Sequence, residues 1–365
     1  MNKKAGKKIL GWFLTFLPAL IGTGLYFLAA RSKTFADWYA DKIYPLWVGS
    51  MGRLTGLVPF SVNEMAIYLL ILLGIIWVVR DLVRAFRKRV RKGWMGRWLR
   101  TVILAGGCLW LAFMIGCGVN YNGRTFAEKY NLDISGGTKE ELADIVRRMV
   151  QEVNALADQV PRDESGLCIM EETLLEDAEA SMRKLSETYD GLDGFYPPAK
   201  AVLWSEFLSM ENICGVHSPF TSEAQYNRLI TPYNIPHTIC HELSHLKGFM
   251  REDEANYIGF LACIGSDSAA FRYSGYMLGY IYVSNALYSV DYDLWFEVRQ
   301  GLCDAALYDL EQNTVYWGRY QTKLAEVKNT ANDNYLKFNH QSDGVKSYGR
   351  VVNLILAYYR ENPQK

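Results

Sequence analysis

The sequence predicts a mainly helical α+β protein with three N-terminal transmembrane helices and a second domain whose small sheet precedes a central helix. Three observations predict this fold class. Long uncharged stretches occur three times within the first 119 residues, helical patterning dominates the remainder, and one predicted helix carries the pattern His-Glu-x-x-His. We therefore divide the chain into a membrane anchor, residues 1–119, and a domain of residues 120–365.

Three stretches are candidate membrane spans. Ile9 to Ala30 contains 22 residues without a charge, which at about 1.5 Å per residue cover about 30 Å of hydrocarbon. A cleaved signal peptide is the alternative, but its apolar core usually has about 7–15 residues, so we favour a retained helix. The second and third spans are predicted at about 62–79 and 101–119. A buried soluble helix explains any one of these stretches, but three of them favour a membrane anchor.

The distribution of charge predicts the orientation of the spans. Residues 1–119 contain 17 Lys and Arg against four Asp and Glu, whereas residues 120–365 contain 22 against 35. Basic residues gather before the first span and between the second and third, and the positive-inside rule places such short segments in the cytoplasm. We therefore predict a multi-pass plasma membrane protein with a cytoplasmic N-terminus and an extracytoplasmic C-terminal domain. Lipid headgroups explain the basic segment, so no nucleic-acid partner is predicted.

After the third span, the sequence predicts helices on both sides of a group of short strands. Thr138 and Glu141 form a capping box at the start of a helix that ends near Gln159, and a second helix covers about 171–189. Short strands are predicted at 201–204, 213–217 and 225–230. Later helices are predicted at 252–264, 268–289, 294–310, 314–328 and 351–361. Seven cysteines occur without a CxxC pair, and no disulfide is predicted.

The run His241-Glu242-Leu243-Ser244-His245 indicates metal chemistry. Two histidines four positions apart project from one face of a helix, where both can bind one tetrahedral Zn²⁺. Glu242 lies beside that face and is the predicted general base, which takes a proton from water and later gives it to the leaving amine. Asn234 is suited to cap this helix and Gly248 to end it. Two ordinary core histidines are the alternative, which we disfavour because the chain has only five histidines.

A catalytic zinc ion requires a third protein ligand. Glu252 and Asn256 share one face of the next predicted helix, so we expect Glu252 to bind the metal and Asn256 to hold a ligand histidine by a hydrogen bond. Glu254 points away from that face and is the weaker candidate. Acidic residues at a helix start also complement the helix dipole, which is the alternative explanation. His237 lies one turn before His241, and we expect it to line or cap the site rather than bind the metal.

The two patterns together resemble the gluzincin clan of zinc peptidases. Membrane-bound members related to the heat-shock and CAAX-prenyl peptidases carry Glu-x-x-Ala-Asp where this chain has Glu252-Asp253-Glu254-Ala255-Asn256. The resemblance implies a zincin-like domain, Glu252 as the third ligand and Asn256 in place of the final Asp. The Asn and the short spacer after His245 depart from the clan's pattern. These two departures imply that the metal ligands are held less firmly and that the chain belongs to a compact, separate branch of the clan.

Over nearly its full length, the chain is also similar to an uncharacterised bacterial family of three-span membrane proteins that carry a domain of unknown function. The stretches that carry this similarity are Pro59-Phe60-Ser61, Asn120-Tyr121, Pro219-Phe220-Thr221 with Glu223-Ala224, the runs beginning at His241 and Glu252, Arg272-Tyr273-Ser274-Gly275 and Ser347-Tyr348-Gly349-Arg350. The similarity implies the three-span architecture and a peptidase-like site, without a known substrate.

The predicted function is that of a membrane-anchored zinc metalloendopeptidase that hydrolyses peptide or protein substrates outside the cytoplasm. The resemblance suggests that the strand before Pro219 is an edge to which a peptide adds, and that Tyr273 or Arg350 stabilises the oxyanion. An ordinary turn and aromatic packing are the alternatives. An intramembrane protease is disfavoured because polar residues flank the metal-binding helix closely. The remaining alternative is a non-catalytic membrane protein with a structural metal site or a ligand-binding pocket.

Overall fold

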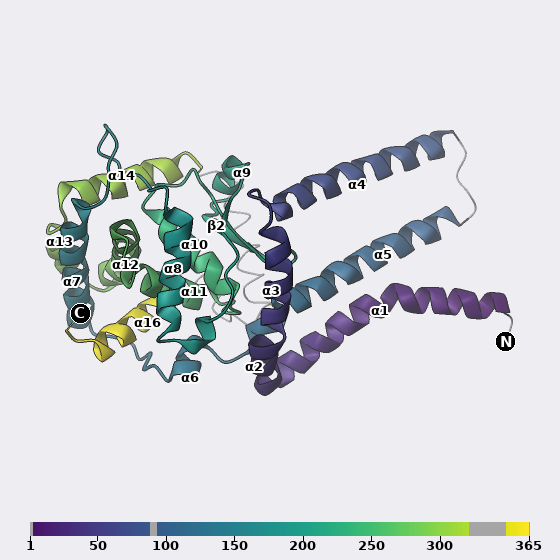
Figure 1. Cartoon of the computed structure of the whole chain (residues 1–365), viewed down its shortest axis with the longest axis horizontal. Helices are drawn as coiled ribbons and strands as arrows, with labels where there is room; N and C mark the ends of the chain where they lie inside the picture. The colour runs from purple at the N-terminus through teal and green to yellow at the C-terminus, as the bar shows by residue number, and fades with distance from the viewer. Residues whose placement is uncertain (1–2, 88–92, 321–347, 365) are drawn as a thin grey trace. The chain divides into compact units, whose positions relative to one another are not determined.

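The computed structural model describes residues 3–87, 93–320 and 348–364 (Figure 1). Its packing separates two compact units. The first comprises Met1–Gly123 together with Ser218–Ser222, and the second comprises Arg124–His217 and Glu223–Lys365. A short segment from the middle of the chain therefore belongs with the N-terminal unit. Each unit is described by itself.

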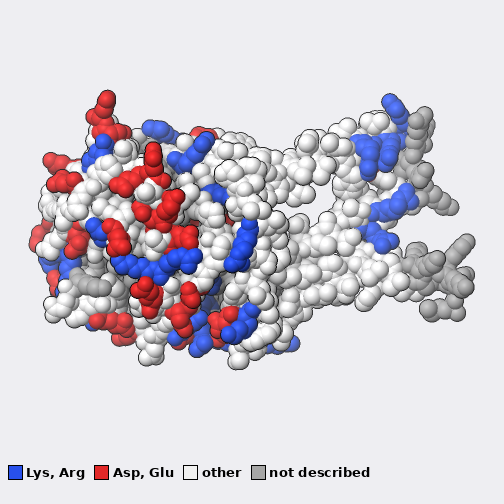
Figure 2. Space-filling view, in the orientation of Figure 1, with Lys and Arg blue, Asp and Glu red and all other residues white. Residues whose placement is uncertain are grey.

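Three helices of the first unit are long and apolar enough to cross a membrane, as predicted. They are α1 (Lys3–Arg31), α4 (Val62–Phe86) and α5 (Trp94–Phe113), and a π-helical turn, Met114–Gly118, continues α5. In Figure 2 the spans are white, and blue Lys and Arg side chains gather where α4 ends and α5 begins. Both helices extend into the charged residues beyond the predicted spans, because charge limits the length inside hydrocarbon but does not interrupt backbone hydrogen bonding.

Helices α1 and α5 pack through small residues. A Cβ atom on Gly107 would lie 3.1 Å from the backbone nitrogen of Ala19, so the two helices approach closely. Arg100 donates hydrogen bonds of 2.8 Å to Thr15 Oγ1 and to the carbonyl of Gly11. In lipid, where burial of apolar surface does not drive helices together, close contacts and interhelical hydrogen bonds of this kind stabilise the pair.

The segment Ser218–Ser222 packs within the first unit against α3 (Tyr44–Thr55), which follows α2 (Lys33–Lys42). Trp47 Nε1 donates to the carbonyl of Pro219 at 3.2 Å, and Thr55 Oγ1 donates to the carbonyl of Thr221 at 3.2 Å. A side chain on Gly116 would overlap the carbonyl group of Pro219. Glycine at this position therefore permits the close approach.

In its described residues, the second unit is mainly helical and contains one three-stranded sheet. The strands are β1 (Lys200–Ala201), β2 (Gly215–Ser218) and β3 (Glu223–Tyr226), in the order β1-β3-β2. β1 runs parallel to β3, with Lys200 opposite Gln225. The helices are α6 (Phe126–Tyr130), α7 (Lys139–Ala157), α8 (Leu174–Ser186), α9 (Ser205–Met210), α10 (Asn234–His245), α11 (Glu252–Ile264), α12 (Ala269–Val290), α13 (Tyr292–Arg299), α14 (Asp304–Gly318) and α16 (Tyr348–Glu361).

Several predicted boundaries differ from the structure. The helix predicted at 294–310 is two helices, α13 and α14, separated near Gly301. The strands are shorter than predicted: the first was predicted at 201–204, but β1 ends at Ala201 and α9 begins at Ser205. A short apolar run does not distinguish the 3.6-residue period of a helix from the two-residue period of a strand. Of the helix predicted at 314–328, the first residues belong to α14, and those beyond Tyr320 lie outside the described residues, as does His340.

Helix α10 lies at the centre of the second unit, packed against α11, α12 and β3. Its predicted apolar face, Ile239 and Leu243, is buried, and Leu246 directly after the helix is buried too. Gly259 on α11 permits a close crossing, because a Cβ atom there would lie 3.2 Å from both Nε2 and the carbonyl oxygen of His237. Short distances between groups on α10 and α11 follow from this contact.

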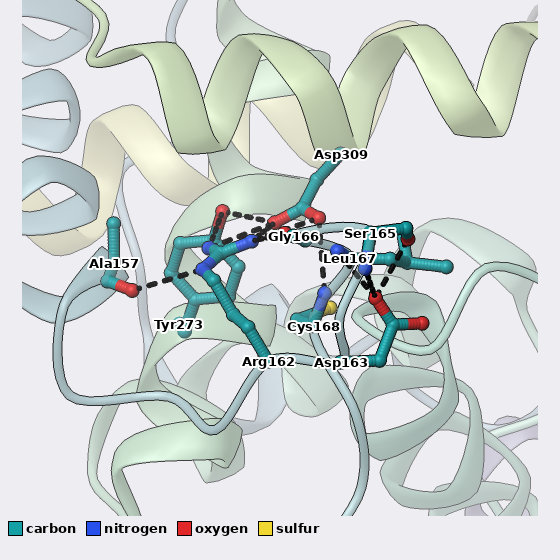
Figure 3. A network of polar contacts seen from close by, with 9 residues as sticks. All are labelled: Ala157, Arg162, Asp163, Ser165, Gly166, Leu167, Cys168, Tyr273 and Asp309. Carbon is teal, nitrogen blue, oxygen red and sulfur yellow. Dashed lines mark hydrogen bonds and ion pairs between the residues drawn. The ribbon is translucent and has the colours of Figure 1, made fainter.

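A buried polar network joins the loop after α7 to α12 and α14 (Figure 3). Asp309, on α14, accepts hydrogen bonds from the hydroxyl of Tyr273 at 2.6 Å and from both terminal nitrogens of Arg162 at 3.1 Å. It also accepts one from the backbone nitrogen of Cys168 at 3.3 Å. The Asp309 side chain has no exposed surface, so these donors replace water around its charge.

Replacement of Asp309 by Ala is expected to destabilise the protein by about 3–5 kcal/mol, because Arg162 keeps a largely buried charge without its partner. Equilibrium unfolding in detergent, followed by tryptophan fluorescence, measures this loss. Asp144→Ala is the control, since it removes an exposed ion pair with Arg147 and is expected to cost less than about 1 kcal/mol. Equal losses for the two variants would contradict the structural role of the network.

Candidate metal centre

The end of α10 brings a backbone carbonyl to one of the predicted ligands. Gly248 has φ of +92°, a conformation that favours glycine. The chain reverses there, and the backbone nitrogen of Phe249 donates to the carbonyl of Ser244 at 3.4 Å, which is the pattern of a Schellman ending. The reversal places the carbonyl oxygen of Phe249 2.7 Å from Nδ1 of His245.

The start of α10 differs from the prediction. Asn234 was expected to cap the helix, but it is the first helical residue and Tyr233 precedes it without a side-chain cap. Asn234 Nδ2 instead donates to Asn313 Oδ1 on α14 at 2.8 Å. The tertiary contact with α14 therefore replaces the local capping bond.

The side chains of His241, His245 and Glu252 converge on one point. The two Nε2 atoms are 3.1 Å apart, and carboxylate oxygens of Glu252 lie 3.3 Å from Nε2 of His241 and 3.9 Å from Nε2 of His245. One ligand atom from each residue falls within 4.8 Å of the others. In a tetrahedral zinc site with bonds of about 2.0–2.1 Å, ligand atoms are about 3.3–3.4 Å apart. The spacing and the chemistry of these donors therefore fit one zinc ion.

The outer nitrogens of both histidines meet carbonyl oxygens. Nδ1 of His241 lies 2.8 Å from Oδ1 of Asn256, and Nδ1 of His245 lies 2.7 Å from the carbonyl oxygen of Phe249. A carbonyl oxygen only accepts hydrogen bonds, so each Nδ1 is a donor, and each Nε2 is the ring nitrogen that faces the centre. This is the contact that the sequence predicted for Asn256.

Burial and mutual charge govern ionisation at the centre. Burial raises the pKa of Glu252, but the hydrogen bond from His241 and the nearby histidine charges outweigh it and lower that pKa to about 2. Burial lowers the pKa of His241, but the hydrogen bond to Glu252 and the charges of Glu242 and Glu252 raise it to about 9. Burial raises the pKa of Glu242 to about 8. Positive charge beside these carboxylates is favoured, and a bound metal cation would supply it.

Two neighbouring candidates have other partners. His237 Nε2 lies 3.0 Å from the backbone oxygen of Asn256, which fits the lining role predicted for this residue. Glu254 accepts hydrogen bonds from the backbone nitrogen of Phe126 at 2.9 Å and from Arg251 at 3.3 Å. The structure therefore places Glu252, and not Glu254, beside the histidines.

The predicted oxyanion role of Tyr273 gains no support from its position. Tyr273 is fully buried, and its hydroxyl group bonds to Asp309 and Arg162 in the network of Figure 3. Its hydroxyl group therefore belongs to a structural hydrogen-bond network. Arg350, the other candidate, has its Nε atom 3.6 Å from Asp253.

Strand β2 contributes two residues that the sequence did not single out. A Cβ atom on Gly215 would lie 2.5 Å from Oε1 of Glu242, so the strand backbone lies directly against the predicted base. The ring of His217 has its centroid 5.7 Å from that of His245. Burial lowers the pKa of His217 well below its usual value. The signal in the sequence that could have found His217 is a histidine in a predicted strand just ahead of the His-Glu-x-x-His helix.

A comparison with known families covers most of the chain. The family model described as "Protein of unknown function (DUF3810)" matches residues 39–356. The chain belongs to this family. The matched range includes α4, α5 and every residue of the candidate metal centre, and it confirms the similarity to a family of unknown function. Neither curated proteins nor solved structures gave a match. The likeness to gluzincins therefore rests on the residue patterns alone.

Proposed function

We propose that this DUF3810 protein is a membrane-anchored, zinc-dependent metallopeptidase that hydrolyses peptide bonds outside the cytoplasm. The observation that carries the proposal is the convergence of His241, His245 and Glu252 within 4.8 Å. Three protein ligands leave one position of a tetrahedral zinc ion free, which is typical of catalytic sites, whereas structural sites use four. The pattern shared with gluzincins supports a zincin-like classification of the second unit.

Zinc, when bound here, supplies a Lewis acid that polarises the substrate carbonyl and makes water more acidic. Glu242 accepts the proton of the attacking water on its carboxylate and passes it to the nitrogen of the leaving amine. Asn256 and the carbonyl of Phe249 hold the two imidazoles in place through Nδ1. The carboxylate of Glu242 is largely buried beneath Gly215, so bulk water does not compete for its proton.

The sheet suggests how a peptide binds. In the order β1-β3-β2, strand β2 is at an edge, and its residue Gly215 lies against Glu242. An extended peptide that pairs with the outer edge of β2 would gain main-chain hydrogen bonds whatever its side chains are. This mode supports an endopeptidase, since it does not require a chain terminus.

The membrane orientation follows from charge. Arg80, Arg84, Arg97 and Arg100 lie where α4 ends and α5 begins, and short basic connections stay in the cytoplasm. In a plasma membrane protein with three spans, the N-terminus then lies in the cytoplasm. The second unit, with the metal centre, then lies on the opposite side of the membrane.

Metal removal tests the proposal. The full-length protein in detergent is expected to contain about one zinc per chain and to cleave members of a peptide library. Treatment with 1,10-phenanthroline should reduce cleavage to background, and added Zn²⁺ should restore it, because water at this centre is not acidic enough without a Lewis acid. Zinc content by mass spectrometry and cleavage by chromatography are measured on the same samples.

The control is Mg²⁺ added to the chelated protein, which should not restore cleavage, because Mg²⁺ prefers oxygen ligands and octahedral geometry. A protein that holds one zinc per chain but cleaves no peptide would contradict the peptidase and favour a structural metal site. A buried glutamate next to the ligands, not needed in a structural site, speaks against that alternative.

A further inference from the structure

We infer that His217 donates a hydrogen bond from Nε2 to the substrate carbonyl oxygen as that oxygen gains negative charge during peptide hydrolysis. The inference rests on the proposed peptidase function and adds a catalytic residue to it. Neither the His-Glu-x-x-His run nor the segment after it contains this residue.

The first argument is the register of β2 over α10. Successive side chains of a strand alternate between its two faces, so Gly215 and His217 share one face. A Cβ atom on Gly215 would lie 2.5 Å from Glu242 Oε1 and 2.8 Å from a methyl group of Thr238. Two residues further along, the ring of His217 lies 5.7 Å from the ring of His245. The face of β2 that carries His217 is therefore turned toward the base and the ligands.

The second argument is the state of its Nε2 atom. Nε2 of His217 is buried and has no hydrogen-bond partner among the residues that the structure describes. A buried polar atom without a partner costs about 1–3 kcal/mol, so a position of this kind requires an explanation. By contrast, Nε2 of His237 lies 3.0 Å from the backbone oxygen of Asn256, and the Nε2 atoms of His241 and His245 face the carboxylate of Glu252. An oxygen of a bound substrate would give His217 the partner that the described residues do not provide.

The third argument is its distance from the ligands. The group whose atoms fall within 4.8 Å of one another contains His241, His245 and Glu252, and His217 is outside it. His217 is therefore not one of the three converging donors, and a substrate carbonyl held at this centre would lie beside its ring, which is next to that of His245. A donor in that place acts most strongly on the tetrahedral transition state, where the oxygen carries the most charge. The hydroxyl group of Tyr273, the donor expected from the sequence, is bonded elsewhere.

The test compares His217→Leu and His217→Gln with the wild type as full-length, zinc-loaded protein. The measurements are zinc per chain, kcat and KM for one peptide that the wild type cleaves, and the inhibition constant of a phosphonamidate analogue of that peptide. We expect His217→Leu to lower kcat by about 10²–10³-fold, as loss of an oxyanion donor does elsewhere. KM and zinc content should change little. The inhibition constant of the phosphonamidate should rise by the same factor by which kcat/KM falls. His217→Gln keeps an N–H donor and should recover part of the loss.

Every other outcome contradicts the assigned role of His217. Wild-type kcat in His217→Leu would overturn the inference, and the peptidase would stand if Glu242→Gln of the same preparation were inactive. Loss of zinc in His217→Leu would make His217 a ligand or a support of the ligands and would also overturn it. An active Glu242→Gln protein would remove the proposed function and the inference with it. If His217→Leu does not fold, as judged by thermal unfolding, His217→Gln and the analogue carry the test.

Discussion

Replacement of Glu242 by Gln is expected to lower kcat for peptide cleavage by about 10²–10⁴-fold while the protein keeps one zinc per chain. Glutamine has the shape of glutamate but cannot take a proton from water. Glu242 is not one of the three converging ligands, so the metal should stay bound. The measurement is the steady-state rate on a peptide that the wild type cleaves, with zinc determined on the same sample.

Glu254→Gln is the matched control, because it makes the same change at another buried glutamate. Glu254 accepts a hydrogen bond from the backbone nitrogen of Phe126, and the amide oxygen of glutamine can accept it too. We expect this variant to retain zinc and most of its rate. Undiminished cleavage by Glu242→Gln would show that another group serves as the base.

Replacement of Glu252 by Gln is expected to release the metal. The change removes the only negative charge among the three converging donors, and a neutral amide is a poor zinc ligand. Loss of a residue that merely orients a ligand costs about 10–100-fold in affinity, so Glu252→Gln should exceed that range. Competition with a chromophoric chelator measures the zinc affinity of the full-length protein.

The series Glu252→Gln, Asn256→Ala and Glu254→Gln separates the three roles that α11 combines. Asn256→Ala should weaken zinc by about 10–100-fold, because Nδ1 of His241 loses its acceptor. Glu254→Gln should bind zinc as the wild type does. If Glu254→Gln released zinc and Glu252→Gln retained it, the third ligand would be misassigned. Circular dichroism of each variant separates loss of metal from loss of the fold.

The sequence by itself predicted the elements that depend on local pattern. Three uncharged stretches predicted the spans because the thickness of hydrocarbon sets a minimum length. The four-residue spacing of His241 and His245 predicted a shared face, since helical geometry is the same in every protein. The i, i+4 relation of Glu252 and Asn256 similarly favoured Glu252 over Glu254 as the third ligand. The structure places Glu252 with the histidines.

The sequence did not predict the features that depend on how elements pack. Gly215 and His217 lie on a strand that is separated from α10 by a segment packed in the other unit, so no spacing along the chain related them to Glu242. Tyr273 was assigned to the site, but a partner 36 residues away, Asp309, binds its hydroxyl group.

The difference has a physical reason. Periodicity decides which side chains share a face of one helix or strand, because backbone hydrogen bonding imposes that geometry locally. Which faces then meet depends on the close fit of many side chains at once. The tertiary structure alone therefore decided that the face of β2 with Gly215 and His217 covers α10, and that the carboxylate of Glu252 reaches both imidazoles.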